Sequence, residues 1–224
     1  INHGYLAVDF FFMLSGFVIA YAYDDRWGKM SVGSFFKRRL IRLQPMVIMG
    51  SIIGAIFFYF QDSPVFPKIH DTSVWYLLVI MVIGATMLPV TVGMDVRGWE
   101  EMHPLNGPAW SLFFEYIGNL LYAVGLRKLS KTALSVLVAI CGLWLAYYAI
   151  TGTRGDMIGG WTINAEQMKI GFTRLLFPFL AGLLLFRTAK LTRVKNAFLW
   201  CSLLLLTVLS IPRIGGAAHL CGVH

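Results

Sequence analysis

The chain has 224 residues, of which 58% are hydrophobic and only 13% are charged, and its formal net charge is +8. Soluble domains are about 45–50% apolar and about 25% charged, so this composition excludes an ordinary soluble domain and indicates a membrane protein. In a soluble protein such a charge would suggest a nucleic-acid partner. Here the cations cluster between apolar runs, so membrane orientation accounts for most of them. We therefore expect the lipid bilayer, and no nucleic acid, as a partner.

Seven apolar runs are long enough, or nearly long enough, to cross about 30 Å of hydrocarbon as helices. No repeat or low-complexity segment separates them, so the sequence predicts a single domain over residues 1–224. Its fold class is all-α, a polytopic transmembrane helix bundle of about seven spans. Both ends look truncated, and we expect an internal fragment of a longer protein. The runs are 6–23, 44–60, 73–92, 108–126, 133–151, 172–188 and 197–214.

Strict alternation of these runs divides the lysines and arginines almost evenly between the two faces, which assigns no orientation. One run is therefore expected to be re-entrant or broken. Residues 73–107, which contain Pro89, Gly93 and Pro104, are the expected place.

The first two runs flank a basic block, Lys37-Arg38-Arg39-Leu40-Ile41-Arg42, with four cations in six residues. Lysines and arginines near span ends favour the cytoplasmic face. One interpretation is a topology anchor that holds lipid headgroups. The other is a fixed site for a polyanion, because an arginine fork binds phosphate at two points. The pattern alone leaves both open.

Three ionisable residues fall at membrane depth, where a charge costs a few kcal/mol and usually marks function. Asp9 lies about one turn into the first run, where it is either an interfacial cap or a functional group. Glu115 lies seven residues past Pro108, with Ser111 on the same helical face. We expect Glu115 to be paired, either with Arg174 or with an arginine of the basic block. Arg174 can equally extend to the membrane interface.

The histidines and cysteines match no metal-binding or nucleophile motif. His70 and His103 lie in loops, where an exposed histidine is the default expectation. Cys141 and Cys201 lie in apolar runs, where packing accounts for them. We expect neither a metal site nor a disulfide framework.

Three separated stretches carry a more specific signal. They are Gly4–Ile19 (GYLAVDFFFMLSGFVI), Phe36–Pro45 (FKRRLIRLQP) and Trp110–Glu115 (WSLFFE). In this order they resemble the second span, the RRxxRxxP element and the WSLxxE signature of the acyltransferase-3 family of bacterial integral-membrane acyltransferases. Gln44 stands where that family often has a tyrosine.

The resemblance implies a multi-pass enzyme of the bacterial inner membrane. It would move an acyl group, most often acetyl, from acyl-CoA to a hydroxyl of a sugar or cell-surface glycan. Acyl-CoA would be a co-substrate, with no permanently bound cofactor and a carbohydrate as acceptor. The implied coenzyme-binding residues are Arg38, Arg39 and Arg42, and the implied site-lining residues are Asp9, Ser15, Trp110, Ser111, Glu115 and Arg174.

The family's proposed general base is a histidine on a span before Gly4. His3 lies too close to Gly4 to take this role, so we expect Glu115 and Ser111 to support catalysis and the chain alone to be inactive. One alternative is a transporter or flippase in which Asp9, Glu115 and Arg174 form a polar relay. A non-catalytic membrane scaffold is a further alternative.

Overall fold

The computed structural model of the protein describes residues 4–61, 71–151, 157–190, 192 and 194–211. Within these ranges the regular structure is helical throughout and no strand occurs, which confirms the predicted all-α membrane bundle. Each of the seven predicted runs corresponds to one α-helix. The helices are α1 (Leu6–Tyr23), α2 (Val32–Phe60), α4 (Val74–Ala85), α5 (Ala109–Val124), α6 (Lys131–Thr151), α7 (Ala165–Thr188) and α8 (Ala197–Ser210).

Four of these helices are long and apolar enough to cross a membrane: α2, α6, α7, and α1 together with the turn that follows it. The other three are shorter. The 12 residues of α4 rise about 18 Å, well short of a hydrocarbon core of about 30 Å. The predicted run 73–92 is therefore helical only as far as Ala85.

The end of α4 has a local cause. Met87, two residues past the last helical residue, has a left-handed backbone with φ of +66°, a conformation that commonly stops a helix. Pro89 follows two residues later and cannot continue a helix. From Thr86 to Pro108 the chain is irregular apart from the short 3-10 turn η2 (Val92–Met94). This broken region lies where the charge pattern predicted one.

Helices α1 and α7 pack with their backbones in contact. A Cβ atom at Gly16 would overlap the backbone carbonyl of Phe179, and one at Gly182 would overlap the carbonyl of Met13. Small residues at both crossing points let two membrane helices approach this closely. Helix α6 then covers α7, while α4 lies along α2.

The ends of α1, α5 and α7 meet at Asp24, the residue that follows α1. Its carboxylate accepts a hydrogen bond from Arg187 near the end of α7 (Nε–Oδ2 2.7 Å). It also accepts one from Tyr122 near the end of α5 (2.7 Å). The three helices therefore run in the same direction, and the loops that follow them share one end of the bundle. We call this the basic end; its cations are Arg26, Lys29, Lys37, Arg38, Arg127, Lys128, Lys131, Arg187 and Lys190.

This arrangement shows why strict alternation gave an even charge count. Alternation separates residues 24–43 from residues 127–132, whereas the contacts of Asp24 bring them together. The difference arises because α4 is too short to count as a crossing. At the other end of the bundle, the Met102 N–H donates to the Trp161 carbonyl (2.7 Å), which joins segment 86–108 to the residues that precede α7.

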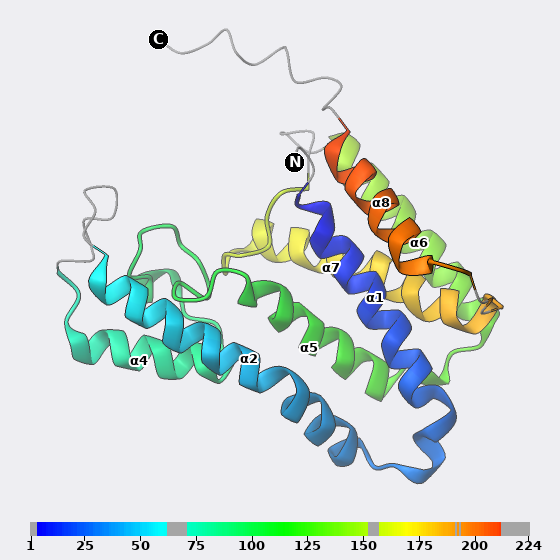
Figure 1. Cartoon of the computed structure of the whole chain (residues 1–224), viewed down its shortest axis with the longest axis horizontal. Coiled ribbons are helices and arrows are strands. Elements are labelled where there is room, and N and C mark those ends of the chain that lie inside the picture. The colour runs from blue at the N-terminus through cyan, green and yellow to red at the C-terminus, as the bar shows by residue number, and fades with distance from the viewer. Residues whose placement is uncertain (1–3, 62–70, 152–156, 191, 193, 212–224) are drawn as a thin grey trace, which may run out of the picture.

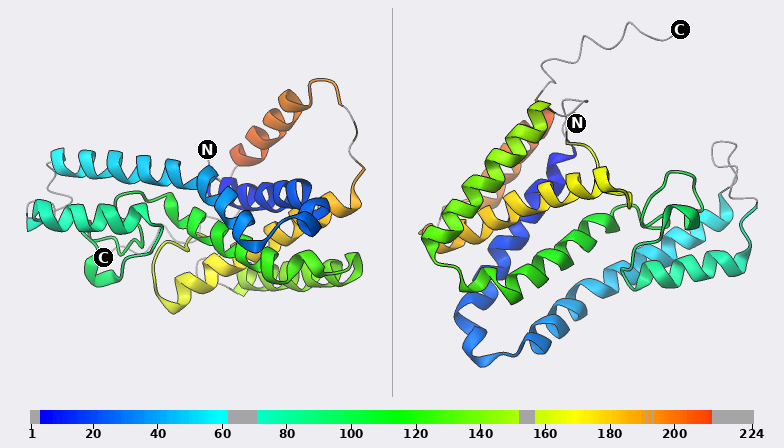
Figure 2. Two further views of the ribbon diagram at one scale, coloured as in Figure 1. Left: turned by 90° about the horizontal axis from the view of Figure 1, so that it is seen from below. Right: turned by 180° about the vertical axis from the view of Figure 1, so that it is seen from behind.

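Figure 1 shows α2 and α4 projecting to one side of the group formed by α1, α5 and α7. Figure 2 shows the same two helices side by side from two further directions. The main core lies where α1, α5 and α7 meet and includes Phe12, Phe114 and Phe179. A second apolar cluster, with Phe58, Ile80 and Leu105, holds segment 86–108 against α2 and α4.

Candidate active site

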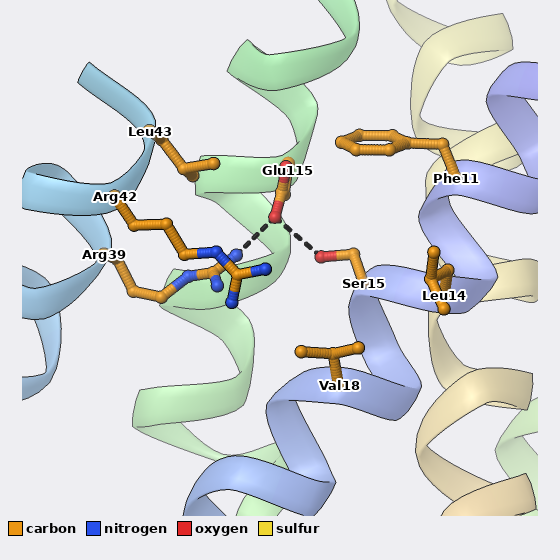
Figure 3. Close-up of a pocket in the computed structure, with 8 residues that line it drawn as sticks. All are labelled: Phe11, Leu14, Ser15, Val18, Arg39, Arg42, Leu43 and Glu115. Carbon is orange, nitrogen blue, oxygen red and sulfur yellow. Dashed lines mark hydrogen bonds and ion pairs between the residues drawn. The ribbon is translucent and has the colours of Figure 1, made fainter. Parts of the chain in front are cut away.

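Glu115 joins three helices at the centre of the bundle. Its Oε1 atom accepts a hydrogen bond from the Ser15 hydroxyl of α1 (2.7 Å) and forms an ion pair with Arg39 of α2. Both charged side chains are 3% exposed. Figure 3 shows the three side chains converging from their separate helices. The prediction that Glu115 is paired is thus confirmed, and its partner is an arginine of the basic block.

The helical register of α2 explains which arginine turns inward. The helix begins after Ser31, whose side chain accepts a hydrogen bond from the Ser34 N–H. Phe35 and Arg39 are four residues apart, share one helical face and are both buried, whereas Arg38 is exposed. The block is therefore helical, with Arg39 paired with Glu115 and Arg38 turned outward.

A cleft of about 110 Å³ lies beside this ion pair, between α1 and α2 and in front of α5. Arg42, which is exposed, lines it together with Arg39 and Glu115. The Glu115 Oε2 and Arg39 Nε atoms are buried and have no hydrogen-bond partner in the described part of the chain. Polar atoms in that condition usually face water or a ligand. The lining residues are Phe11, Leu14, Ser15, Val18, Arg39, Arg42, Leu43 and Glu115.

The three arginines that the family resemblance assigned to the coenzyme thus occupy three different environments. Arg42 lines the cleft and is exposed. Arg39 also lines it but is held by Glu115. Arg38 lies on the exposed face of α2, outside the set of residues that lines the cleft.

Arg174 is the centre of a second, separate cluster. Its Nε atom donates to Asp9 of α1 (2.9 Å), and its Nη2 atom donates to the Tyr5 carbonyl (2.6 Å). Its Nη1 atom donates to the Gly159 carbonyl (3.2 Å), and its guanidinium carbon lies 5.3 Å from the centre of the Trp110 ring. Arg174 therefore stays buried and braces α1, α5 and α7.

The transporter alternative required Asp9, Glu115 and Arg174 to form one polar relay. The structure instead divides these residues between two separate ion pairs. Asp9 is paired with Arg174, and Glu115 is paired with Arg39. The Asp9–Arg174 pair ties α1 to α7, so Asp9 helps to hold the bundle together.

Ser111 shares a helical face with Glu115 but opens into a different cavity. Its hydroxyl donates to the Pro108 carbonyl (2.9 Å). Ser111 lines a cavity with Trp110 and Trp161, whereas Glu115 lines the cleft. A serine nucleophile needs a base that takes its proton, and the Ser111 hydroxyl donates to a backbone carbonyl instead.

The expectation that His103 is exposed was wrong. It is 2% exposed, because segment 86–108 folds back against α2 and α4. Its Nε2 atom lies 3.5 Å from the Met87 carbonyl. Burial lowers the pKa of His103 to about 4, although the contact with Met87 opposes that shift.

Two further polar residues lie on the helices that carry the site: Asn119 on α5, which no sequence motif marked, and Gln44 on α2, which lies within the motif Phe36–Pro45. Asn119 is fully buried, and neither atom of its amide has a partner in the described residues. It lies one turn beyond Glu115, so helical periodicity was the available signal. Gln44 donates to the Ala85 carbonyl and accepts from Tyr116 (3.2 Å), which links α2, α4 and α5.

The model of the acyltransferase domain family matches residues 2–220, so the chain belongs to that family. This confirms the resemblance and defines the class as membrane acyltransferases. The chain is 36% identical over 143 residues to protein 2 in the picA locus of Rhizobium radiobacter. This alignment covers 59% of the chain and 72% of that protein. It is 29% identical over 130 residues to the acyltransferase MdmB of Streptomyces mycarofaciens. This second alignment covers 57% of the chain and 30% of that protein. No solved structure matches the chain significantly.

Proposed function

We propose that the protein transfers an acyl group, in the first instance acetyl, from acyl-CoA to a hydroxyl of a sugar or glycan. We place this activity in the inner membrane of a bacterium, with the basic end in the cytoplasm, where lysines and arginines accumulate. The observation that carries the proposal is the cleft in which the buried Arg39–Glu115 pair lies beside the exposed Arg42.

The cleft is large enough for only one part of the coenzyme. Pockets that enclose drug-sized ligands measure about 300–1,000 Å³, whereas the cleft measures about 110 Å³. It suits the narrow thioester end of acyl-CoA, and the nucleotide stays outside it. The exposed Arg42 and Arg38 are then the forks that bind phosphate.

The interior of the cleft offers a positive charge to the reacting carbonyl. When a hydroxyl oxygen attacks the thioester carbon, the carbonyl oxygen becomes negative, and a fixed donor there lowers the barrier. The buried Arg39 Nε–H, which has no partner among the described residues, is such a donor. The C–S bond then breaks, and the hydroxyl proton ends on the departing thiol.

We assign Glu115 a positioning role. Its Oε1 atom holds both Arg39 and Ser15, and so fixes the guanidinium within the cleft. A general base must also take the hydroxyl proton, and the residues that line the cleft include no histidine. We therefore place the base outside the set of residues that lines the cleft.

The test uses the full-length protein in liposomes with labelled acetyl-CoA and a mixed glycan acceptor. Arg42→Lys keeps the charge but loses the fork, so it should weaken acetyl-CoA binding without reducing membrane insertion. Arg26→Lys, an exposed arginine at the same end, is the matched control. If Arg42→Lys binds acetyl-CoA as tightly as the parent, the basic block is an anchor and the proposal is wrong.

A further inference from the structure

A second cavity lies at the end of the bundle opposite the basic end. Its volume is about 350 Å³, and two tryptophans line it. We call it the tryptophan cavity. Its position is fixed by Trp161, whose carbonyl accepts the bond from Met102 in segment 86–108. The lining residues are Val8, Glu101, Gly107, Pro108, Trp110, Ser111 and Trp161.

The tryptophan cavity and the cleft lie one helical turn apart on the same two helices. On α5, Ser111 lines the cavity and Glu115, four residues later, lines the cleft. On α1, Val8 lines the cavity and Phe11, three residues later, lines the cleft. One turn of helix rises about 5.4 Å. The cavity therefore lies next to the cleft along both helices.

The walls of the tryptophan cavity combine aromatic surface with hydrogen-bonding oxygens. The rings of Trp110 and Trp161 are inclined at 69° with their centres 6.4 Å apart, so they form a corner. Arg174 occupies one face of Trp110, which leaves Trp161, only partly buried, as the accessible ring. Ser111 adds a hydroxyl, which can both donate and accept.

Glu101 gives the cavity its charge preference. Its Oε2 atom is buried and has no hydrogen-bond partner in the described part of the chain. The buried Glu101 carboxyl is poorly hydrated, and this raises its pKa more than the nearby Arg97 lowers it. An ionised carboxylate only accepts hydrogen bonds, and no cation belongs to the set of lining residues. The cavity therefore suits a neutral ligand rich in hydroxyl groups, and it disfavours phosphates and carboxylates.

We propose that the tryptophan cavity holds one neutral sugar ring of the acyl acceptor, with Trp161 against the ring and Glu101 accepting hydrogen bonds from its hydroxyls. A volume at the lower end of the usual range for ligand pockets suits a single ring. The proposal rests on the proposed function, because it takes the bound sugar to supply the attacking hydroxyl. That hydroxyl oxygen bonds to the thioester carbon, the C–S bond breaks, and the products are a sugar ester and the free thiol of CoA.

A kinetic test separates the acceptor from the coenzyme in the full-length enzyme. Glu101→Gln and Trp161→Ala should each raise the KM for the glycan acceptor about tenfold, with the KM for acetyl-CoA unchanged. The matched controls are Glu100→Gln, an exposed neighbour, and Trp75→Ala, a tryptophan on α4 that is 79% exposed. Transfer that continues with an unchanged acceptor KM in both cavity variants would overturn the sugar site alone. A parent that binds no acetyl-CoA would instead overturn the proposed function.

A binding test needs no turnover. Saturation-transfer NMR with the full-length protein in detergent would use neutral methyl hexopyranosides as probes and hexose phosphates as charged comparators. We expect signal from the neutral sugars in the parent and in Trp75→Ala, and its loss in Trp161→Ala. Glu101→Gln provides the same test if Trp161→Ala does not fold. Equal signal in the parent and both cavity variants, or stronger signal from the phosphates, would refute the site.

Discussion

Arg187 donates two hydrogen bonds to the Asp24 carboxylate, from Nε to Oδ2 (2.7 Å) and from Nη2 to Oδ1 (3.1 Å). The same arginine donates to the carbonyls of Leu129 (3.1 Å) and Arg127 (3.3 Å). One side chain therefore joins the end of α7 to the end of α1 and to the loop after α5. This contact sets the relative direction of the three helices.

Asp24→Asn should destabilise the protein, because it leaves Arg187 without its charge partner at a mostly buried site. Breaking a fully buried pair costs about 3–5 kcal/mol, and we expect about 1–3 kcal/mol for this pair, which is partly exposed. Thermal unfolding in detergent measures the effect. Asp25→Asn, at the exposed neighbouring position, should leave the melting temperature unchanged. Equal stability of the two variants would contradict the assigned contact.

The basic end should lie entirely on one side of the membrane. In a variant without native cysteines, Lys29→Cys and Lys128→Cys should react with a membrane-impermeant thiol reagent from the same side. Thr91→Cys, in segment 86–108, should react from the opposite side. All three positions are exposed. Labelling of Lys29→Cys and Lys128→Cys from opposite faces would restore strict alternation and make α4 a crossing helix.

Glu115→Gln should lower both the folded yield and the activity, because it leaves the buried Arg39 charge unpaired. The expected cost is about 3–5 kcal/mol. Glu166→Gln, an exposed glutamate in the first turn of α7, is the control. The double variant Arg39→Met/Glu115→Leu tests the role directly. Replacing a buried ion pair by apolar residues often restores stability, so this variant should fold while transferring no acyl group. Full activity in the double variant would remove the pair from the site.

His103 should make stability depend on pH below about pH 6.5. The unfolded chain protonates this histidine near its ordinary pKa of 6.5, whereas the folded protein does so only near pH 4. Between these values the unfolded state binds more protons, so the free energy of unfolding falls as the pH falls. The loss is on the order of 3 kcal/mol across the interval. Glu101 has a raised pKa and acts in the opposite direction. The measurement is therefore the difference between the parent and His103→Gln; identical pH profiles would show that His103 is not buried as a neutral group.

The sequence predicted the helices of this fold better than it predicted which of them pack against one another. Apolar length located the seven α-helices named above, and the expectation that a buried glutamate needs a partner anticipated the contact between Glu115 and the basic block. Pattern could not choose between Arg39 and Arg174 as that partner, because the choice depends on which helices are neighbours. The burial of His103 was missed for a similar reason: a loop is usually exposed, and only tertiary packing places this one against α2 and α4.

We expect the length of α5 to affect the bilayer around the site. Its 16 residues rise about 24 Å, several ångströms less than an average hydrocarbon core. A helix shorter than the hydrocarbon core makes the surrounding lipid thin or the flanking side chains reach for the headgroups. Hydrophobic mismatch of this kind would bring the two aqueous phases closer together at the helix that carries both the cleft and the tryptophan cavity. The coenzyme and the sugar that we propose as substrates, arriving from opposite faces, would then have less apolar distance to bridge. Activity should accordingly rise in thinner, shorter-chain lipids, as reconstitution in a series of bilayers of increasing thickness would measure.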